Sequence, residues 1–313
     1  MFGIMFHHFH SHSYPRAQGA ISSQQFEDML VFLQKRKTIL AASDWMEKAL
    51  RGKLKSGEIC LTFDDNLRCQ HDLALPVLRQ CGITAFWFIN TSALNGGPAR
   101  LEVYRYFRTA CFNNIEEFYS SFFAAAGGSA YGATISNALS SFDPTRYLPE
   151  YPFYTDNDRK FRFVRNDVLG VNCYNALMDF MIETSRFDVK EVTKRLCMDG
   201  DCLRTLSTEG HVLGLHSHTH PTYLSSLSEE CQRTEFELNC QHLRAIIKEK
   251  PKTMAHPCNS YNTTTLAVLR KMGIRLGFRA NMVEHSNQFN LEYPREDHAN
   301  VLREMKAERG AGR

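Results

Sequence analysis

The sequence lacks the segments that are typical of membrane and secreted proteins. No apolar run approaches the roughly 20 residues that a membrane-spanning helix needs. The N-terminal stretch MFGIMFHHFHSHSYPR has no basic segment followed by a long apolar one, as a signal peptide would have. We therefore expect a cytoplasmic protein with no integral membrane segment.

Cysteine pairs at short spacing are also missing. The ten cysteines include no Cys-x-x-Cys pair, and the two closest are Cys197 and Cys202. A zinc ribbon or a disulfide framework would need closer or more regular spacing, so we expect scattered free thiols in a reducing compartment.

A large excess of charge of either sign is absent. The net charge is only +3 over 313 residues, which gives no reason to expect nucleic acid as a partner. Apolar residues make up 43% of the chain, an ordinary share for a globular protein. The length suits one large α/β domain, and we expect a single domain over residues 1–313.

Strand and helix patterns alternate at both ends of the chain. Residues 58–63 (EICLTF) and 84–89 (TAFWFI) have the composition of buried strands, and residues 68–80 between them have helical spacing. The alternation returns later, with helices expected at 228–249 and 263–272 and strands at 211–215, 252–255, 274–278 and 291–293. This alternation is typical of parallel α/β architecture.

The middle of the chain breaks this pattern. Residues 98–208 have mostly helical spacing and are rich in Tyr and Phe, as in YRYFRTACF and EEFYSSFF. We interpret this stretch as a helical, aromatic-rich insertion within the α/β domain.

Polar motifs follow two of the expected strands. The first is Thr62-Phe63-Asp64-Asp65, and the second is His216-Ser217-His218-Thr219-His220. Because the carboxyl ends of parallel strands share one rim of a sheet, the two motifs should face each other. Two histidines four residues apart can hold one ion, and one carboxylate would complete a site with open positions for water and substrate.

The second carboxylate of the pair has a separate use as a general base beside a metal-bound water. Each motif alone also has a structural interpretation, the acidic pair as a solvated turn or helix cap and the histidines as surface residues. Their joint occurrence, each directly after an apolar strand, favours the metal site.

The motifs TFDD and HSxTH resemble those of the NodB-homology polysaccharide deacetylases, carbohydrate esterase family 4. Residues 255–262 (AHPCNSYN) look like the third motif of that family, and the resemblance covers about 1–95 and 205–300. It implies a distorted (β/α) barrel, an α/β fold often built on about seven strands. It also implies a divalent metal, usually zinc, with cobalt, nickel, iron or manganese as alternatives.

The resemblance also implies roles for individual residues. Asp64 matches the catalytic base, and the expected metal ligands are Asp65, His216 and His220. In the third motif, the expected substrate-binding residues are Pro257, Cys258, Tyr261 and Asn262.

The chain departs from the family's pattern in its first and third motifs. Asn66 replaces the usual Gly after the Asp pair, and the third motif lacks the Arg that normally pairs with the base. We expect Arg295 to compensate by reaching the Asp64 carboxylate and holding it ionised; the alternative is a surface Arg in a charged loop. For the family's general acid the candidates are His285 and His298, and we favour His298.

Other histidines have weaker claims to the site. His218 lies between the two expected ligands and either points away or touches substrate. An N-terminal cluster could line the same rim of the sheet; it comprises His7, His8, His10 and His12.

The predicted reaction is hydrolytic removal of an N-acyl group, N-acetyl in the first instance, from an amino sugar. A cytoplasmic location would exclude wall polymers, so we expect a nucleotide- or lipid-linked sugar intermediate in surface-polysaccharide (O-antigen) biosynthesis. Two alternatives stay open. One is a deformylase or amidase acting on another small amide, and the other is a non-catalytic sugar-binding protein that retains the fold.

Overall fold

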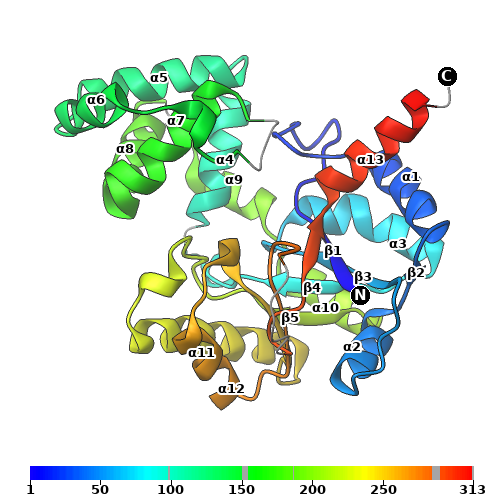
Figure 1. Cartoon of the computed structure of the whole chain (residues 1–313). Coiled ribbons are helices and arrows are strands. Elements are labelled where there is room, and N and C mark those ends of the chain that lie inside the picture. The colour runs from blue at the N-terminus through cyan, green and yellow to red at the C-terminus, as the bar shows by residue number, and fades with distance from the viewer. Residues whose placement is uncertain (98, 150–153, 186, 284–289, 312–313) are drawn as a thin grey trace. The chain divides into compact units, whose positions relative to one another are not determined.

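The computed structural model describes residues 1–97, 99–149, 154–185, 187–283 and 290–311 (Figure 1). Its eight strands run parallel in the order β7-β6-β5-β4-β3-β1-β8, with β2 paired to β3. The strands are β1 (Phe2–Phe6), β2 (Thr38–Ile39), β3 (Glu58–Phe63), β4 (Phe86–Ile89), β5 (Val212–Leu215), β6 (Thr253–Ala255), β7 (Leu276–Phe278) and β8 (Arg295–Asp297).

The segment that leads into β8 nearly closes this sheet into a barrel. The N–H of Gly277 in β7 donates to the carbonyl of Asn290, and the N–H of Tyr293 donates back to Gly277. A Cβ at Gly277 would lie 2.6 Å from the carbonyl oxygen of Leu291, so this close approach of two backbones requires glycine. The predicted class, an α/β distorted (β/α) barrel of about seven strands with a large helical insertion, is confirmed. The strand expected at 291–293 is instead one bridge, Phe278 to Tyr293.

The register of the central strands aligns their carboxyl ends. Phe6 of β1 pairs with Phe63 of β3, and Phe63 pairs with Trp87 of β4. The rings of Phe63 and Trp87 stack at 4.4 Å between centroids, and all three side chains are fully buried. Because the register is shared, the residues after β1 and β3 emerge at the same level of the rim.

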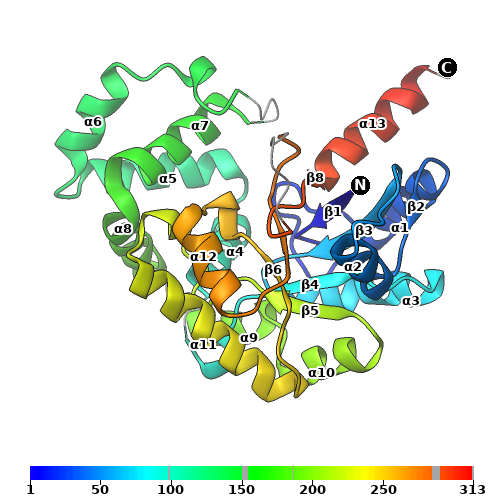
Figure 2. The same ribbon diagram turned by 60° about the horizontal axis from the view of Figure 1, so that its bottom comes forward.

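Helices pack around the strands in the barrel unit (Figure 2). The sequence sets their limits: Ser22 caps the first of them with a capping box, and Gly82 ends the third in a left-handed conformation. A π-helical turn at Gln70–Ala74 precedes that third helix. The helices are α1 (Ser23–Gln34), α2 (Ala42–Leu50), α3 (Leu75–Cys81), α10 (Gly200–Thr208), α11 (Glu229–Ile247), α12 (Thr263–Lys271) and α13 (His298–Ala311).

The chain divides into two compact units, a barrel unit of residues 1–101 and 191–313 and a helical unit, Glu102–Lys190. The helical unit is therefore shorter than the stretch 98–208 that we interpret as the insertion. Whether both units act as a single domain over 1–313 stays a prediction. In the middle of the chain the helices are α4 (Arg100–Ala110), α5 (Ile115–Gly127), α6 (Gly132–Ser140), α7 (Asp156–Phe163), α8 (Gly170–Thr184) and α9 (Val189–Leu196).

The core of the helical unit is built from aromatic rings. Phe118, Phe122 and Phe161 are fully buried, and the ring of Phe161 packs edge-on at 5.4 Å from Phe118 and 4.9 Å from Phe122. A π-helical segment, Val164–Leu169, joins α7 to α8. Among the described residues, no helix has both the length and the apolar character needed to span a bilayer.

Candidate metal centre

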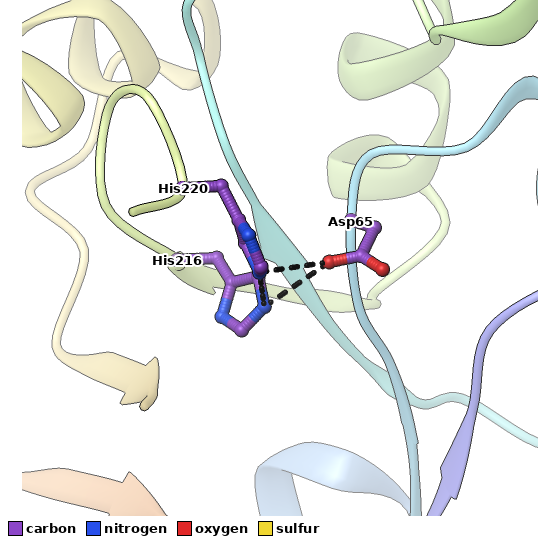
Figure 3. Close-up of side chains that lie close together, drawn as sticks. All are labelled: Asp65, His216 and His220. Carbon is purple, nitrogen blue, oxygen red and sulfur yellow. Dashed lines mark hydrogen bonds and ion pairs between the residues drawn. The ribbon is translucent and has the colours of Figure 1, made fainter. Parts of the chain in front are cut away.

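Asp65, His216 and His220 converge at the carboxyl ends of β3 and β5 (Figure 3). Nε2 of His216 lies 3.3 Å from Oδ1 of Asp65, and Nε2 of His220 lies 3.2 Å from the same oxygen. The two Nε2 atoms are 3.1 Å apart. Three atoms bound tetrahedrally to one zinc ion at about 2.0–2.1 Å would be about 3.3 Å apart. The spacing therefore fits a single small cation.

The ligand atoms present lone pairs toward one another. Nδ1 of His216 lies 2.9 Å from the carbonyl oxygen of Ala255, which can only accept, so Nδ1 carries the proton and Nε2 is free to bind a metal. Oδ1 of Asp65 is buried and has no hydrogen-bond partner among the described residues. Such a donor set suits a divalent cation. Within the described part of the chain, these residues form the only group of three such ligands.

The backbone at this centre adopts conformations that side chains rarely take. Asp65, Ser217 and His220 have φ of 78°, 60° and 57°. Asn66, which stands where the similar family usually has Gly, has φ of 57°. This is a left-handed conformation that Gly favours and Asn tolerates. These turns point consecutive side chains in different directions. The structure thus separates the contacts of Asp64 and Asp65.

Asn239 of α11 holds the second motif in position. Its side-chain oxygen accepts from the N–H of His216 at 3.0 Å, and its amide donates to the carbonyl of Ile89 at 2.8 Å. The side chain is fully buried. Asn239 is not among the residues predicted from the sequence, where its one signal is a polar residue on the buried face of a helix.

Asp64 forms a bidentate ion pair with Arg295. The guanidinium nitrogens Nη1 and Nη2 lie 2.7 and 2.8 Å from the two carboxylate oxygens, and both side chains are buried. Burial alone would raise the pKa of Asp64, but the charge of Arg295, followed by that of His216, holds this pKa below its ordinary value. Gly3 leaves room for the long side chain, because a Cβ there would lie 3.2 Å from Cγ of Arg295.

The comparison with known proteins agrees with this geometry. Residues 176–277, about a third of the chain, match the family model described as Polysaccharide deacetylase. Over these residues the chain is similar to the polysaccharide deacetylase family. No curated protein matches it in sequence.

Solved structures of deacetylases share the fold. PplD, a Streptococcus pyogenes deacetylase in complex with acetate, superimposes with a TM-score of 0.55 at 14% identity, covering 95% of this chain and 91% of that one. The deacetylase domain of BpsB from Bordetella bronchiseptica gives 0.53 at 13%, covering 95% of both chains. IcaB from Ammonifex degensii gives 0.51 at 15%, covering 94% and 86%. At these identities the likeness establishes the fold alone.

His7, one of the N-terminal histidines, lies beside both carboxylates. It follows Phe6 directly, level with Asp64 on the rim. Its Nε2 lies 3.9 Å from one oxygen of Asp64 and 3.9 Å from one oxygen of Asp65. The side chain is 27% exposed, so it is accessible from solvent.

His298, the expected general acid, has a different setting. Nε2 lies 2.9 Å from the carbonyl of Gly19, and Nδ1 lies 3.2 Å from the carbonyl of Met5. The ring stacks on Phe6 at 5.6 Å and is buried. Its described contacts do not include the Asp pair. The other candidate, His285, lies outside the described residues.

The third motif supports the metal centre through its backbone. The carbonyl of Ala255 accepts a hydrogen bond from Nδ1 of His216. Pro257 and Cys258 follow in a tight turn, in which Pro257 is buried and Cys258 is exposed with φ of 49°. Tyr261 stacks on the buried His256 at 4.0 Å.

Two of the expected substrate-binding residues have partners within the protein. The hydroxyl of Tyr261 donates to Glu292, and Asn262 caps α12 by accepting from the N–H of Thr265. Substrate contacts by these residues stay a prediction.

His218, between the two histidine ligands, packs edge-on against His242 at 5.0 Å. Its Nδ1 lies 3.0 Å from the hydroxyl of Thr91.

Proposed function

We propose that this chain is a metal-dependent hydrolase that removes an N-acyl group, N-acetyl in the first instance, from an amino sugar. The observation that carries the proposal is that two adjacent carboxylates, Asp64 and Asp65, have different partners. Asp65 converges with two imidazoles on one point, while Asp64 is kept apart and ionised by Arg295.

The roles follow from the contacts of each residue. Asp65, His216 and His220 would hold one divalent cation, for which zinc is the first expectation. When bound, such a cation polarises an amide carbonyl and lowers the pKa of a bound water. Asp64 takes a proton from the attacking water, and Arg295 keeps Asp64 ionised for this task.

The reaction also needs a proton for the leaving amine. The water oxygen bonds to the carbonyl carbon, the C–N bond breaks, and the nitrogen leaves as a free amine. His7 is accessible and lies beside both carboxylates, so we propose His7 as the donor. His298 stays the alternative from the sequence.

We propose a nucleotide- or lipid-linked amino sugar of surface-polysaccharide (O-antigen) biosynthesis as the substrate class. A panel of N-acetyl, N-formyl and ureido compounds, with the sugar free or diphosphate-linked, would separate this class from other small amides.

Release of acetate from N-acetylated sugars tests the proposal. The metal-loaded protein should release acetate, and Asp64→Asn should lower the rate by at least about 100-fold while the protein keeps its metal. Asp44→Asn is the matched control, because Asp44 is exposed on α2. Equal rates for the Asp64 variant and the wild type would remove the proposal.

A further inference from the structure

The arginines of the helical unit differ in the partners that the described residues offer them. Arg105 has a carboxylate 2.8 Å away, and Arg159 donates to two backbone carbonyls. Arg108, Arg162 and Arg165 differ from these two. Within the described residues, none of the three forms an ion pair with a carboxylate.

All three side chains are partly buried. Loss of water lowers the pKa of Arg108 to about 10, and burial likewise lowers the pKa of Arg162. Nε of Arg162 is buried and makes no hydrogen bond among the described residues. Partial loss of water weakens the hydration of a charged group, so a partly buried arginine usually has an acceptor or a paired charge nearby.

Aromatic rings lie close to all three guanidinium groups. Cζ of Arg162 lies 3.9 Å from the ring centre of Tyr154. Cζ of Arg108 lies 5.5 Å from the ring centre of Phe161, and Cζ of Arg165 lies 5.8 Å from the same ring. The charges of all three arginines act on the phenol of the buried Tyr174. Arg162 and Arg165 flank the start of the π-helical segment, and such segments are frequent at functional sites.

We propose that Arg108, Arg162 and Arg165 form a binding site for a phosphate or diphosphate group. Each guanidinium can donate two parallel hydrogen bonds to a phosphate. A carboxylate ligand would balance only one of the three charges, whereas a phosphate monoester carries about −1.5 to −2 at pH 7. The hydroxyl of Tyr174, which makes no hydrogen bond within the described residues, adds a further donor.

The site lies wholly within the helical unit and depends on neither the metal centre nor the proposed deacetylation. A diphosphate also joins sugars to nucleotide and lipid carriers, so the ligand could be part of a substrate or a free anion. Both sources share the chemistry that the arginines recognise.

Calorimetric titration of the full-length protein with inorganic pyrophosphate tests the site. The Asp65→Asn protein is used as the background, so that pyrophosphate held by a metal does not contribute. We expect saturable binding of one pyrophosphate, and a loss of affinity of about tenfold or more in Arg108→Met and in Arg162→Met. Arg146→Met is the matched control, because Arg146 is exposed in the same unit, and its affinity should be unchanged.

Thermal unfolding of the same variants separates binding from folding. Because Met removes a partly buried charge that has no carboxylate partner within the described residues, Arg108→Met and Arg162→Met should melt no lower than the background protein without pyrophosphate. Arg165→Met offers an independent variant if either of these is poorly folded.

Two results would overturn the site: no saturable binding by the background protein, or equal binding by the folded arginine variants. Competition of pyrophosphate with a nucleotide diphosphate N-acetyl sugar shows whether the natural ligand is part of a substrate or a free anion. Displacement of pyrophosphate supports the site as part of substrate binding, and its absence supports a site for a free anion.

Discussion

Asp64 and Asp65 are adjacent in the sequence but have different partners. The left-handed backbone at Asp65 and Asn66 turns the two carboxylates apart, one toward Arg295 and one toward the histidines. Their spacing in the sequence could not assign these tasks. The resemblance to a known family predicts different tasks for the two residues, and their different contacts are consistent with that prediction.

Arg295 controls the ionisation of Asp64. Because the folded pKa of Asp64 lies below its unfolded value, the pair contributes stability above about pH 3.9 that is lost as the pH falls through the folded pKa. In Arg295→Met, burial would dominate and raise the pKa of Asp64. The acidic limb of the pH profile of kcat/KM should therefore move to higher pH, and turnover at neutral pH should fall about 100-fold with metal content unchanged.

Arg275→Met is the control for that experiment, because Arg275 is exposed on the same unit. An unshifted acidic limb in Arg295→Met would show that Asp64 does not titrate as the base. Loss of the buried partner should also cost about 3 kcal/mol of stability, measurable by urea unfolding.

His7 and His298 can be distinguished by their different settings. His7→Gln should lower kcat about 100-fold with little change in stability, because its ring is partly exposed beside the carboxylates. His298→Gln should lower the melting temperature, because its ring is packed against Phe6 and two carbonyls. A folded His298→Gln protein without activity, beside an active His7→Gln, would reverse the two roles.

Helix α11 links the sheet to the histidine motif through its buried polar face. Asn239 joins the end of β4 to the N–H of His216, whereas Gln232, two turns earlier, bonds to Leu227 and Thr265. Asn239→Ala should lower zinc affinity about 10- to 100-fold, because His216 loses its support. Gln232→Ala should cost similar stability and leave zinc affinity intact. Equal affinities in both variants would show that Asn239 supports only the fold.

Elements with strong local signals were predictable from the sequence. The strand expected at 58–63 has the same bounds as β3 in the structure. Two features had no local signal. The π-helical turn at Gln70–Ala74 depends on packing, and α6 forms within a stretch rich in Gly and Ser.

At the scale of the whole molecule, the site depends on contacts between distant parts of the chain. The helical unit lies between Asp65 and His216 in the sequence. Arg295, from near the C-terminus, lies on β8, which pairs with β1, and β1 in turn pairs with β3. The sequence predicted that the two motifs share a rim because both follow parallel strands. It could not predict the strand order or the closure at Gly277, because nothing local specifies which strands pair.

The central claim is that one divalent cation binds to Asp65, His216 and His220. Zinc content measured by mass spectrometry after chelation, reloading and dialysis tests it most directly. We expect one zinc ion per chain in the wild type and in Asp44→Asn, and almost none in folded Asp65→Asn or His216→Ala protein. A wild type that holds no divalent ion, or variants that retain a full equivalent, would contradict it.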